Sequence, residues 1–524
     1  MTGLGELPSS LTWLRIVEQP TFSHNTMARL IRFLTVKFDV SKERVMRFFR
    51  RIALFFALSV AIAAHAYDAA KWQEDFAQAR RELARSYANL DWVVAERRID
   101  LQALAERTEQ GLATARNDEE AVNVLERFLD TFGDGHVRLL PPKRAEAAAA
   151  PATTPTATAT DMKTCRDMGY QPMRRDREAI NFGSTGQYEA LANEDAAILP
   201  AGVLKAGGKM LGVIRIGLFA EQTFPMLCER EHPARAPCDS ACQRRIFTRV
   251  GKALTRTLER QVQVLAAKKV DAIVVDITGN GGGTDWAEAA ARVLTKPGVA
   301  APRISFIKHP HWVKAIDNRL DDIDRDLKRP TIGAEQRAWL LAARTELMKS
   351  RSLAAEPCER EAIWKNQRVC ALLVPARLHS TGLEATPRAL DFRGYEAEWV
   401  HYNVAGYEPN VAWQGKLAIL VDNNTASAAE LFTATLKDNG RATLIGAPTK
   451  GLGCGYTDGG IPITLRNSGV QIRVPDCARL RANGENEVAG IVPDVLVPWR
   501  GNDSPYQRAA RALAALESWT EKLK

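Results

Sequence analysis

Two apolar runs, each leading directly into a helical pattern, limit the possible folds of this chain more than any other feature. LAILVDN (Leu417 to Asn423) precedes apolar residues at helical spacing, and KVDAIVVDI (Lys269 to Ile277) precedes a second helical stretch over Trp286 to Leu294. Short continuous apolar runs are typical of strands buried on both faces, as in parallel sheets with crossover helices. The sequence therefore predicts a mixed α/β domain with buried parallel strands.

The rest of the chain divides into segments of different composition. Residues 67–140 predict helices that end in an Asp-Gly-His turn, and an Ala/Thr/Pro tract marks a linker over residues 141–163. The core is expected over residues 164–524, with a strand at Met210 to Phe219 and a long helix at Arg244 to Lys268. Residues 300–400 are charged and irregular, with helical patches, and are interpreted as an insertion. A β-rich segment is expected near the end.

The stretch from Met46 to Ala66 has the pattern of a cleavable signal peptide. A basic start precedes an apolar run and an Ala-His-Ala site. The run, at about 13 residues, is shorter than the ~20 that a helix needs to cross a bilayer. We expect cleavage after Ala66, a periplasmic or secreted mature chain without a membrane span, and residues 1–45 as an upstream extension of the reading frame.

Charge and cysteine content agree with an exported globular protein. The formal net charge is +9, but residues 1–66 hold nine Lys or Arg and four Asp or Glu, so +4 is left for the mature chain and a nucleic-acid partner is not expected. All eight cysteines follow Ala66, and an even number in an exported chain favours disulfides. Cys454–Cys477 and Cys358–Cys370 are suggested as local pairs. Cys238 and Cys242 have no second pair that would complete a zinc site.

Ser427 stands at the junction between the strand that ends near Asn423 and its helix. Serine is a common helix N-cap, but Asn424 and Thr425 offer alternative caps, and small neighbours leave the hydroxyl open. The other junction, DITGNGGGTDW (Asp276 to Trp286), is rich in glycine, which lets several N–H groups converge on an anion. Together the two junctions suggest a nucleophile beside an oxyanion hole. His136, in a glycine-bounded turn, is a candidate base.

These motifs resemble a known family. NTASAAELF…LKDNGRATLIGAPTKG and VVDITGNGGG are similar to the S41 peptidases, which include the C-terminal-processing (tail-specific) proteases and their tricorn-like and interphotoreceptor-retinoid-binding-protein-like relatives. The likeness covers most of the mature chain, from the Asp-Gly-His turn to Gly490-x-x-Pro-Asp494. It implies a crotonase-like α/β spiral core with an N-terminal helical subdomain.

The resemblance also implies roles for particular residues. The nucleophile is Ser427, and the oxyanion donors are the amides of Gly281 or Gly282 and of Ala428. The base differs between branches. In the tail-specific branch it is a lysine in Pro-Thr-x-Gly-Lys, where this chain has Leu452, with Lys450 two residues earlier. In the tricorn-like branch it is a histidine assisted by a glutamate, and His136 and Glu487 match these. The serine that precedes that histidine is Gly135 here.

The resemblance implies an exported serine endopeptidase that cuts a polypeptide substrate without metal or organic cofactor. His136 is favoured as base, because a neutral imidazole accepts a proton near pH 7, whereas a lysine must first be buried. The pH–rate profile should then rise near ~6.5, before any shift caused by the surroundings. Lys450 stays the alternative base. A binding protein for a peptide or hydrophobic ligand, with the fold but without the chemistry, stays the alternative function. Substrate specificity and oligomeric state are not predicted.

Overall fold

The computed structural model describes residues 67–140, 164–172, 179–232, 238–295, 299–379, 382–383, 395–397, 413–457 and 459–523. All of the described residues belong to one compact unit, residues 67–524. The expected upstream extension, signal peptide and linker all lie outside the described residues, so these stay predictions.

A seven-stranded sheet forms the centre of the described unit. Its strand order is β14-β10-β9-β5-β4-β3-β2, and its five strands from β14 to β4 are parallel, as expected for the two apolar runs. The two edge strands at the other side run antiparallel. The strands are β2 (Tyr188–Ala190), β3 (Ala201–Ala206), β4 (Lys209–Arg215), β5 (Ala272–Asp276), β9 (Lys416–Val421), β10 (Thr443–Gly446) and β14 (Val495–Leu496).

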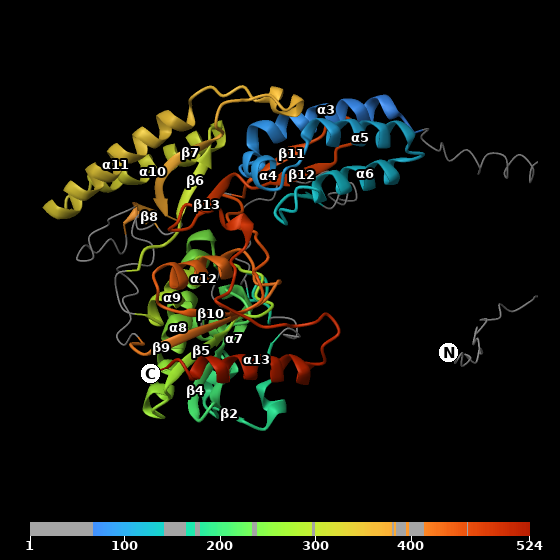
Figure 1. Ribbon diagram of the computed structural model, residues 1–524. Helices are drawn as coiled ribbons and strands as arrows, with labels where there is room; N and C mark the ends of the chain where they lie inside the picture. Colours follow the sequence, from blue (N-terminus) through green and yellow to red (C-terminus); the bar gives the residue numbers. More distant parts are fainter. Residues whose placement is uncertain are drawn as a thin grey trace, which may run out of the picture. The chain divides into compact units, whose positions relative to one another are not determined.

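Helices cover both faces of this sheet, which explains why its central strands are apolar throughout. In β5, Ile273 and Val275 pack on one face with α8, α9 and α12, whereas Ala272 and Val274 pack on the other with α13. Figure 1 shows α9 and α12 beside each other, and the two helices are in contact. The helices are α7 (Pro225–Glu231), α8 (Ser240–Ala267), α9 (Trp286–Val293), α12 (Ala428–Asp438) and α13 (Pro505–Thr520).

The N-terminal segment is helical, as predicted, and packs on a small antiparallel sheet. Trp72, Phe76 and Phe128 share a buried core with Ile472 of that sheet, whose strand order is β1-β12-β11. The β1–β12 pairing joins the strand after His136 to a segment near the chain's end. The elements are α3 (Ala69–Ser86), α4 (Leu90–Glu96), α5 (Leu101–Thr114), α6 (Asp118–Asp130), β1 (Arg138–Leu140), β11 (Ile461–Thr464) and β12 (Gln471–Val474).

The region 300–400, expected to be irregular with helical patches, contains two long helices and three strands among its described residues, so it is more regular than expected. Its interpretation as an insertion stays a prediction. Two helices pack as a pair, and a four-stranded sheet of order β13-β6-β7-β8 lies against them. The many charges belong to the exposed faces of the helices, where ion pairs such as Arg351–Asp317 form. The elements are β6 (Arg303–Ile307), α10 (Pro310–Leu327), α11 (Ala334–Ala354), β7 (Leu373–His379), β8 (Gly382–Leu383) and β13 (Cys477–Leu480).

All eight cysteines form disulfides. The suggested pairs Cys454–Cys477 and Cys358–Cys370 are confirmed. The other two bonds, Cys165–Cys228 and Cys238–Cys242, were not foreseen as pairs. Among the helices of the described residues, none combines the length and the apolar character needed to cross a bilayer.

Candidate active site

Ser427 lies at the N-cap of α12, directly after the turn that follows β9, as the sequence predicts. Its backbone adopts φ 55° and ψ −116°, a conformation that residues with a side chain rarely take. The strain is held by hydrogen bonds, since the Ser427 N–H donates to Glu430 Oε2 (2.9 Å) and its carbonyl accepts from Arg479 Nη2 (2.7 Å). Strained backbone fixed in this way is common at functional sites.

The glycine-rich turn after β5 touches the Ser427 turn. A Cβ atom on Gly282 (φ 103°) would lie 2.7 to 2.8 Å from Ala426 O, Ala428 N and Ser427 Cβ, so only glycine fits there. The Gly282 N–H is already donated to Asn280 Oδ1 at 2.9 Å. Among the hydrogen bonds of the described residues, none uses the N–H of Gly281 or Ala428. These two amides are therefore the better candidates for oxyanion donors.

His136 lies in the turn between α6 and β1, and its Nδ1 is 2.7 Å from the carbonyl oxygen of Leu452. Because a carbonyl only accepts, Nδ1 carries the proton and Nε2 presents its lone pair. The ring edge packs on Tyr456, and the His136 N–H donates to the buried Asp134 carboxylate (3.0 Å). Burial, with smaller contributions from nearby arginines, lowers the pKa of His136 to about 4. The ring is thus neutral near pH 7, as a base must be.

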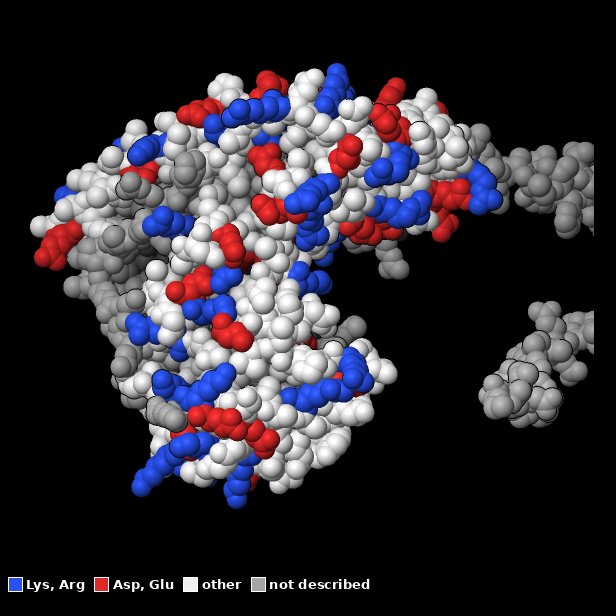
Figure 2. All heavy atoms as spheres, viewed as in Figure 1, with Lys and Arg blue, Asp and Glu red and all other residues white. Residues whose placement is uncertain are grey.

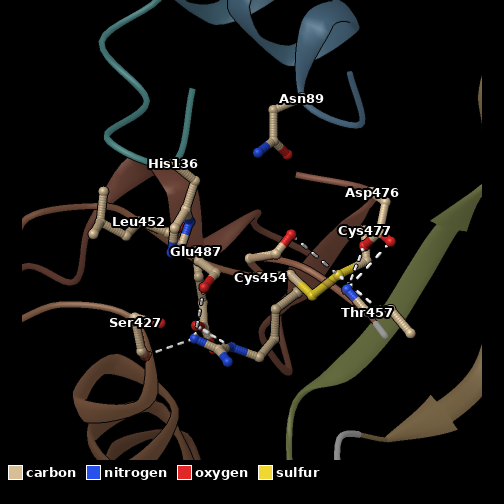
Figure 3. Close-up of a disulfide and its surroundings, with 12 residues drawn as sticks. Asn89, His136, Ser427, Leu452, Cys454, Thr457, Asp476, Cys477 and Glu487 are labelled. Atoms are coloured by element: carbon tan, nitrogen blue, oxygen red, sulfur yellow. Dashed lines mark hydrogen bonds and ion pairs between the residues drawn. A yellow bond between two sulfur atoms is a disulfide. The ribbon is translucent and has the colours of Figure 1, made fainter. Parts of the chain in front are cut away.

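Glu487 is fully buried in the same site, but its contact differs from the expected one. Its Oε2 pairs with Arg479 Nε at 2.5 Å, while the ring of His136 is oriented by the Leu452 carbonyl. Arg479, from β13, also donates to Ser427 O and to Gly453 O. Burial raises the pKa of Glu487 to about 7. Figure 3 shows Ser427, His136, Leu452 and Glu487 on one side of the Cys454–Cys477 disulfide.

The hydrogen bonds of the described residues include none between the side chains of Ser427 and His136. His136 contacts the loop Thr449–Gly455 directly, through Leu452 O, whereas Ser427 is connected to this loop through Glu430 and Arg479. The alternative base Lys450 belongs to this loop, but its side chain is exposed. Leu452, at the tail-specific lysine position, contributes its backbone carbonyl to His136. No group of three or more potential metal ligands occurs among the described residues.

Three contributors escaped the sequence reasoning. Glu430 accepts several N–H groups of the loop, Arg479 connects Ser427 with Glu487, and the Leu452 carbonyl orients His136. Only Glu430 had a readable signal, because Ser427-x-x-Glu430 has the spacing of a capping box. An arginine 52 residues from the serine has none.

Comparison with known proteins agrees with this geometry. The model of peptidase family S41 matches residues 247–497, which include the glycine turn, Ser427 and Glu487. Over these residues the chain is similar to peptidase family S41. The match begins after His136, so this candidate base lies outside it. An uncharacterized protein of Chlamydia muridarum (strain MoPn / Nigg) is 24% identical over 253 residues, which are 47% of this chain and 37% of that protein.

Solved structures share the fold of this chain. Mature CPAF has a TM-score of 0.55 at 14% identity, over 87% of this chain and 98% of that one. Mature CPAF complexed with lactacystin has a TM-score of 0.53 at 13% identity, over 87% and 99%. The predicted family is thereby confirmed, as is the α/β fold with its helical N-terminal region.

Proposed function

We propose that this S41 chain is an exported serine endopeptidase that cuts a polypeptide through an acyl-enzyme on Ser427. The observation that carries the proposal is the state of His136. Its Nδ1–H is fixed by the Leu452 carbonyl, so Nε2 is free of its proton and the ring is neutral. A base in that state, held by a loop that Glu430 and Arg479 connect to a strained serine at a helix N-terminus, suits acyl transfer.

The proposed reaction runs in two steps. His136 Nε2 takes the Ser427 Oγ proton while Oγ attacks the substrate carbonyl carbon, and the amides of Gly281 and Ala428 stabilise the oxyanion. Nε2–H then protonates the leaving amine, which breaks the peptide bond and leaves an ester on Ser427. Water, deprotonated by the same Nε2, hydrolyses the ester and releases the acid product. The helix dipole of α12 favours negative charge at this end.

Glu487 stays in the proposal as the carboxylate that supports the base, with its effect passing through Arg479. The buried pair neutralises the guanidinium, which in turn holds Ser427 O and Gly453 O. Removing one partner of a buried pair leaves an uncompensated charge. Loss of Glu487 should therefore disturb the serine turn and the loop together.

A polypeptide substrate and an exported location are part of the proposal. Four disulfides need an oxidising compartment, which supports the signal peptide expected at Met46 to Ala66. Acidic and basic side chains are interspersed over the face in Figure 2, which suits a peptide better than a nucleic acid. No observation at the site specifically favours the alternative, a binding protein for a peptide or hydrophobic ligand.

Labelling with a fluorophosphonate probe tests the function directly, because the probe reacts with an activated serine. We expect the mature protein to be labelled at Ser427 and the Ser427→Ala variant to remain unlabelled. His136→Ala should lower the labelling rate by ~10²–10⁴-fold. Lys450→Ala should change it little because that side chain is exposed, and Glu487→Gln should fall between them.

Two outcomes would contradict the proposal. If the folded protein is not labelled by a probe that labels other S41 peptidases, the binding-protein alternative is favoured. If folded His136→Ala keeps its rate while Lys450→Ala loses it, Lys450 is the base.

A further inference from the structure

Glu430 lies in the first turn of α12, three residues after Ser427, and the reaction proposed above gives it no role. Its side chain is fully buried and its carboxylate receives donors from two segments. Oε1 accepts from Thr449 Oγ1 (2.6 Å) and Gly451 N–H (2.7 Å). Oε2 accepts from Ser427 N–H and Leu452 N–H, both at 2.9 Å, and from Gly453 N–H at 3.4 Å.

This donor set requires a carboxylate. A carboxylate has two acceptor oxygens with about four lone-pair sites, whereas the amide of glutamine has one acceptor oxygen and one donor group. A glutamine at position 430 would keep the shape of Glu430. Its amide NH₂ group, however, would replace one of the two acceptor oxygens and would face the N–H donors that this oxygen accepts. Each buried donor that loses its acceptor costs about 1–3 kcal/mol.

Glu430 fixes the residue that orients the base. Leu452 donates its N–H to Glu430 and accepts the His136 Nδ1–H with its carbonyl, so the two contacts lie on either side of one α-carbon. If the loop moves away from Glu430, the carbonyl that selects the His136 tautomer moves with it.

The same oxygen also fixes the nucleophile. Glu430 Oε2 holds the N–H of Ser427, whose backbone has the strained φ of 55°. Such conformations cost about 1–3 kcal/mol and persist only when surrounding contacts enforce them. One carboxylate oxygen therefore contacts the serine turn and the loop that carries the orienting carbonyl.

We propose that Glu430 is a positioning residue that fixes the Ser427 backbone and, through the N–H groups of Gly451 and Leu452, the tautomer of His136. This inference rests on the proposed serine peptidase function. It assigns Glu430 no contact with the substrate.

The test compares Glu430→Gln with Glu288→Gln. Glu288 is an equally buried glutamate in the first turn of the neighbouring helix α9, where it pairs with Arg292 at 2.6 Å. Glu430→Gln should lower the fluorophosphonate labelling rate of Ser427 by about 10²-fold, the size expected when a base loses its orientation. Glu288→Gln should stay within about threefold of the unchanged protein. Thermal unfolding of each variant verifies that it is folded.

A second measurement separates positioning from a general loss of stability. In ¹⁵N-histidine-labelled protein, the imidazole nitrogen shifts of His136 should report a protonated Nδ1 and an unprotonated Nε2. Glu430→Gln should shift them toward a mixture of the two tautomers, and Glu288→Gln should leave them unchanged. Glu430→Asp keeps the charge but withdraws it by one methylene, so it should give an intermediate rate even where Glu430→Gln does not fold.

The inference is overturned if folded Glu430→Gln, or Glu430→Asp in its place, keeps both the labelling rate and the His136 shifts. If the unchanged protein itself is not labelled while its His136 shifts still respond to Glu430→Gln, the peptidase function fails and the positioning contact stands.

Discussion

The backbone of Ser427 stores strain that a different residue would release. Glycine adopts a φ of 55° without the steric conflict that a Cβ causes. We therefore expect Ser427→Gly to be more stable than Ser427→Ala by about 1 kcal/mol, although both variants lack the nucleophile. Urea unfolding of the two variants measures the difference. Equal stability would mean that the turn is not strained.

Burial of His136 sets the pH range of the reaction. With a pKa lowered to about 4, the ring is neutral throughout the range where an exposed histidine would be half protonated. The contribution of His136 to the labelling rate of Ser427 should therefore hold from pH 7 to pH 5 and fall near pH 4, rather than near ~6.5 as the unshifted pKa suggests.

The pH dependence of the labelling rate should also be measured on Glu487→Gln. The pKa of Glu487 is raised to about 7, so its titration would add a second step to the pH profile of the unchanged protein. The sign for stability agrees with that for activity. The unfolded chain binds the His136 proton more tightly, so this contribution is complete above pH ~6.5 and is lost as the pH falls toward 4. A limb at 6.5 in both proteins would show that His136 is exposed to water.

The two residues that depart from the family motifs, Gly135 and Leu452, pack against each other. A Cβ on Gly135 would lie 2.5 Å from Leu452 Cδ2, so the serine of one branch and the lysine of the other are both replaced where Gly135 and Leu452 meet. Sequence reasoning noted each departure separately. It could not relate them, because they lie over 300 residues apart.

At the scale of elements, the disulfide Cys454–Cys477 ties the loop Thr449–Gly455 to β13, the strand that carries Arg479. Cys358–Cys370 closes a loop of similar size elsewhere, with sequence separations of 12 and 23 residues for the two bonds. Replacing either pair by serines should lower the free energy of unfolding by about 3 kcal/mol. Only the double variant Cys454→Ser/Cys477→Ser should also slow the labelling of Ser427, because the loop Thr449–Gly455 carries the Leu452 carbonyl that orients His136.

Chemical denaturation and labelling on the same two samples provide the comparison. Equal labelling rates in the two double variants would show that the loop keeps its position without the bond.

The elements that the sequence predicted are those with local signals. β5, β9, α8 and α12 follow from apolar runs and helical spacing, and Ser427 and Gly282 were found because each stands at a strand–helix junction. The four-stranded sheet was missed because β13 pairs with β6 from far along the chain. The orienting carbonyl of Leu452 was missed because it is a backbone group, which every residue has, so the sequence carries no signal for it.

At the scale of the whole molecule, the described compact unit starts at Tyr67, directly after the expected cleavage site at Ala66. We expect the exported protein to begin at Tyr67 and its mass to rise by about 8 Da on full reduction, since each of four disulfides takes up two hydrogens. Intact-mass measurement before and after reduction tests both. A chain that retains Met46 to Ala66, or eight free thiols, would overturn the proposed export.

The pairing of His136 with Leu452 spans 316 residues, and β1 pairs with β12 over a similar distance. At about 5–20 residues per second, a ribosome needs roughly 15–60 s to pass from one residue to the other. Throughout that interval the nascent chain holds its imidazole without the carbonyl that sets its tautomer. We therefore expect the proposed peptidase to be inactive while its own chain is being synthesised, which would protect neighbouring polypeptides during that interval without a separate inhibitor.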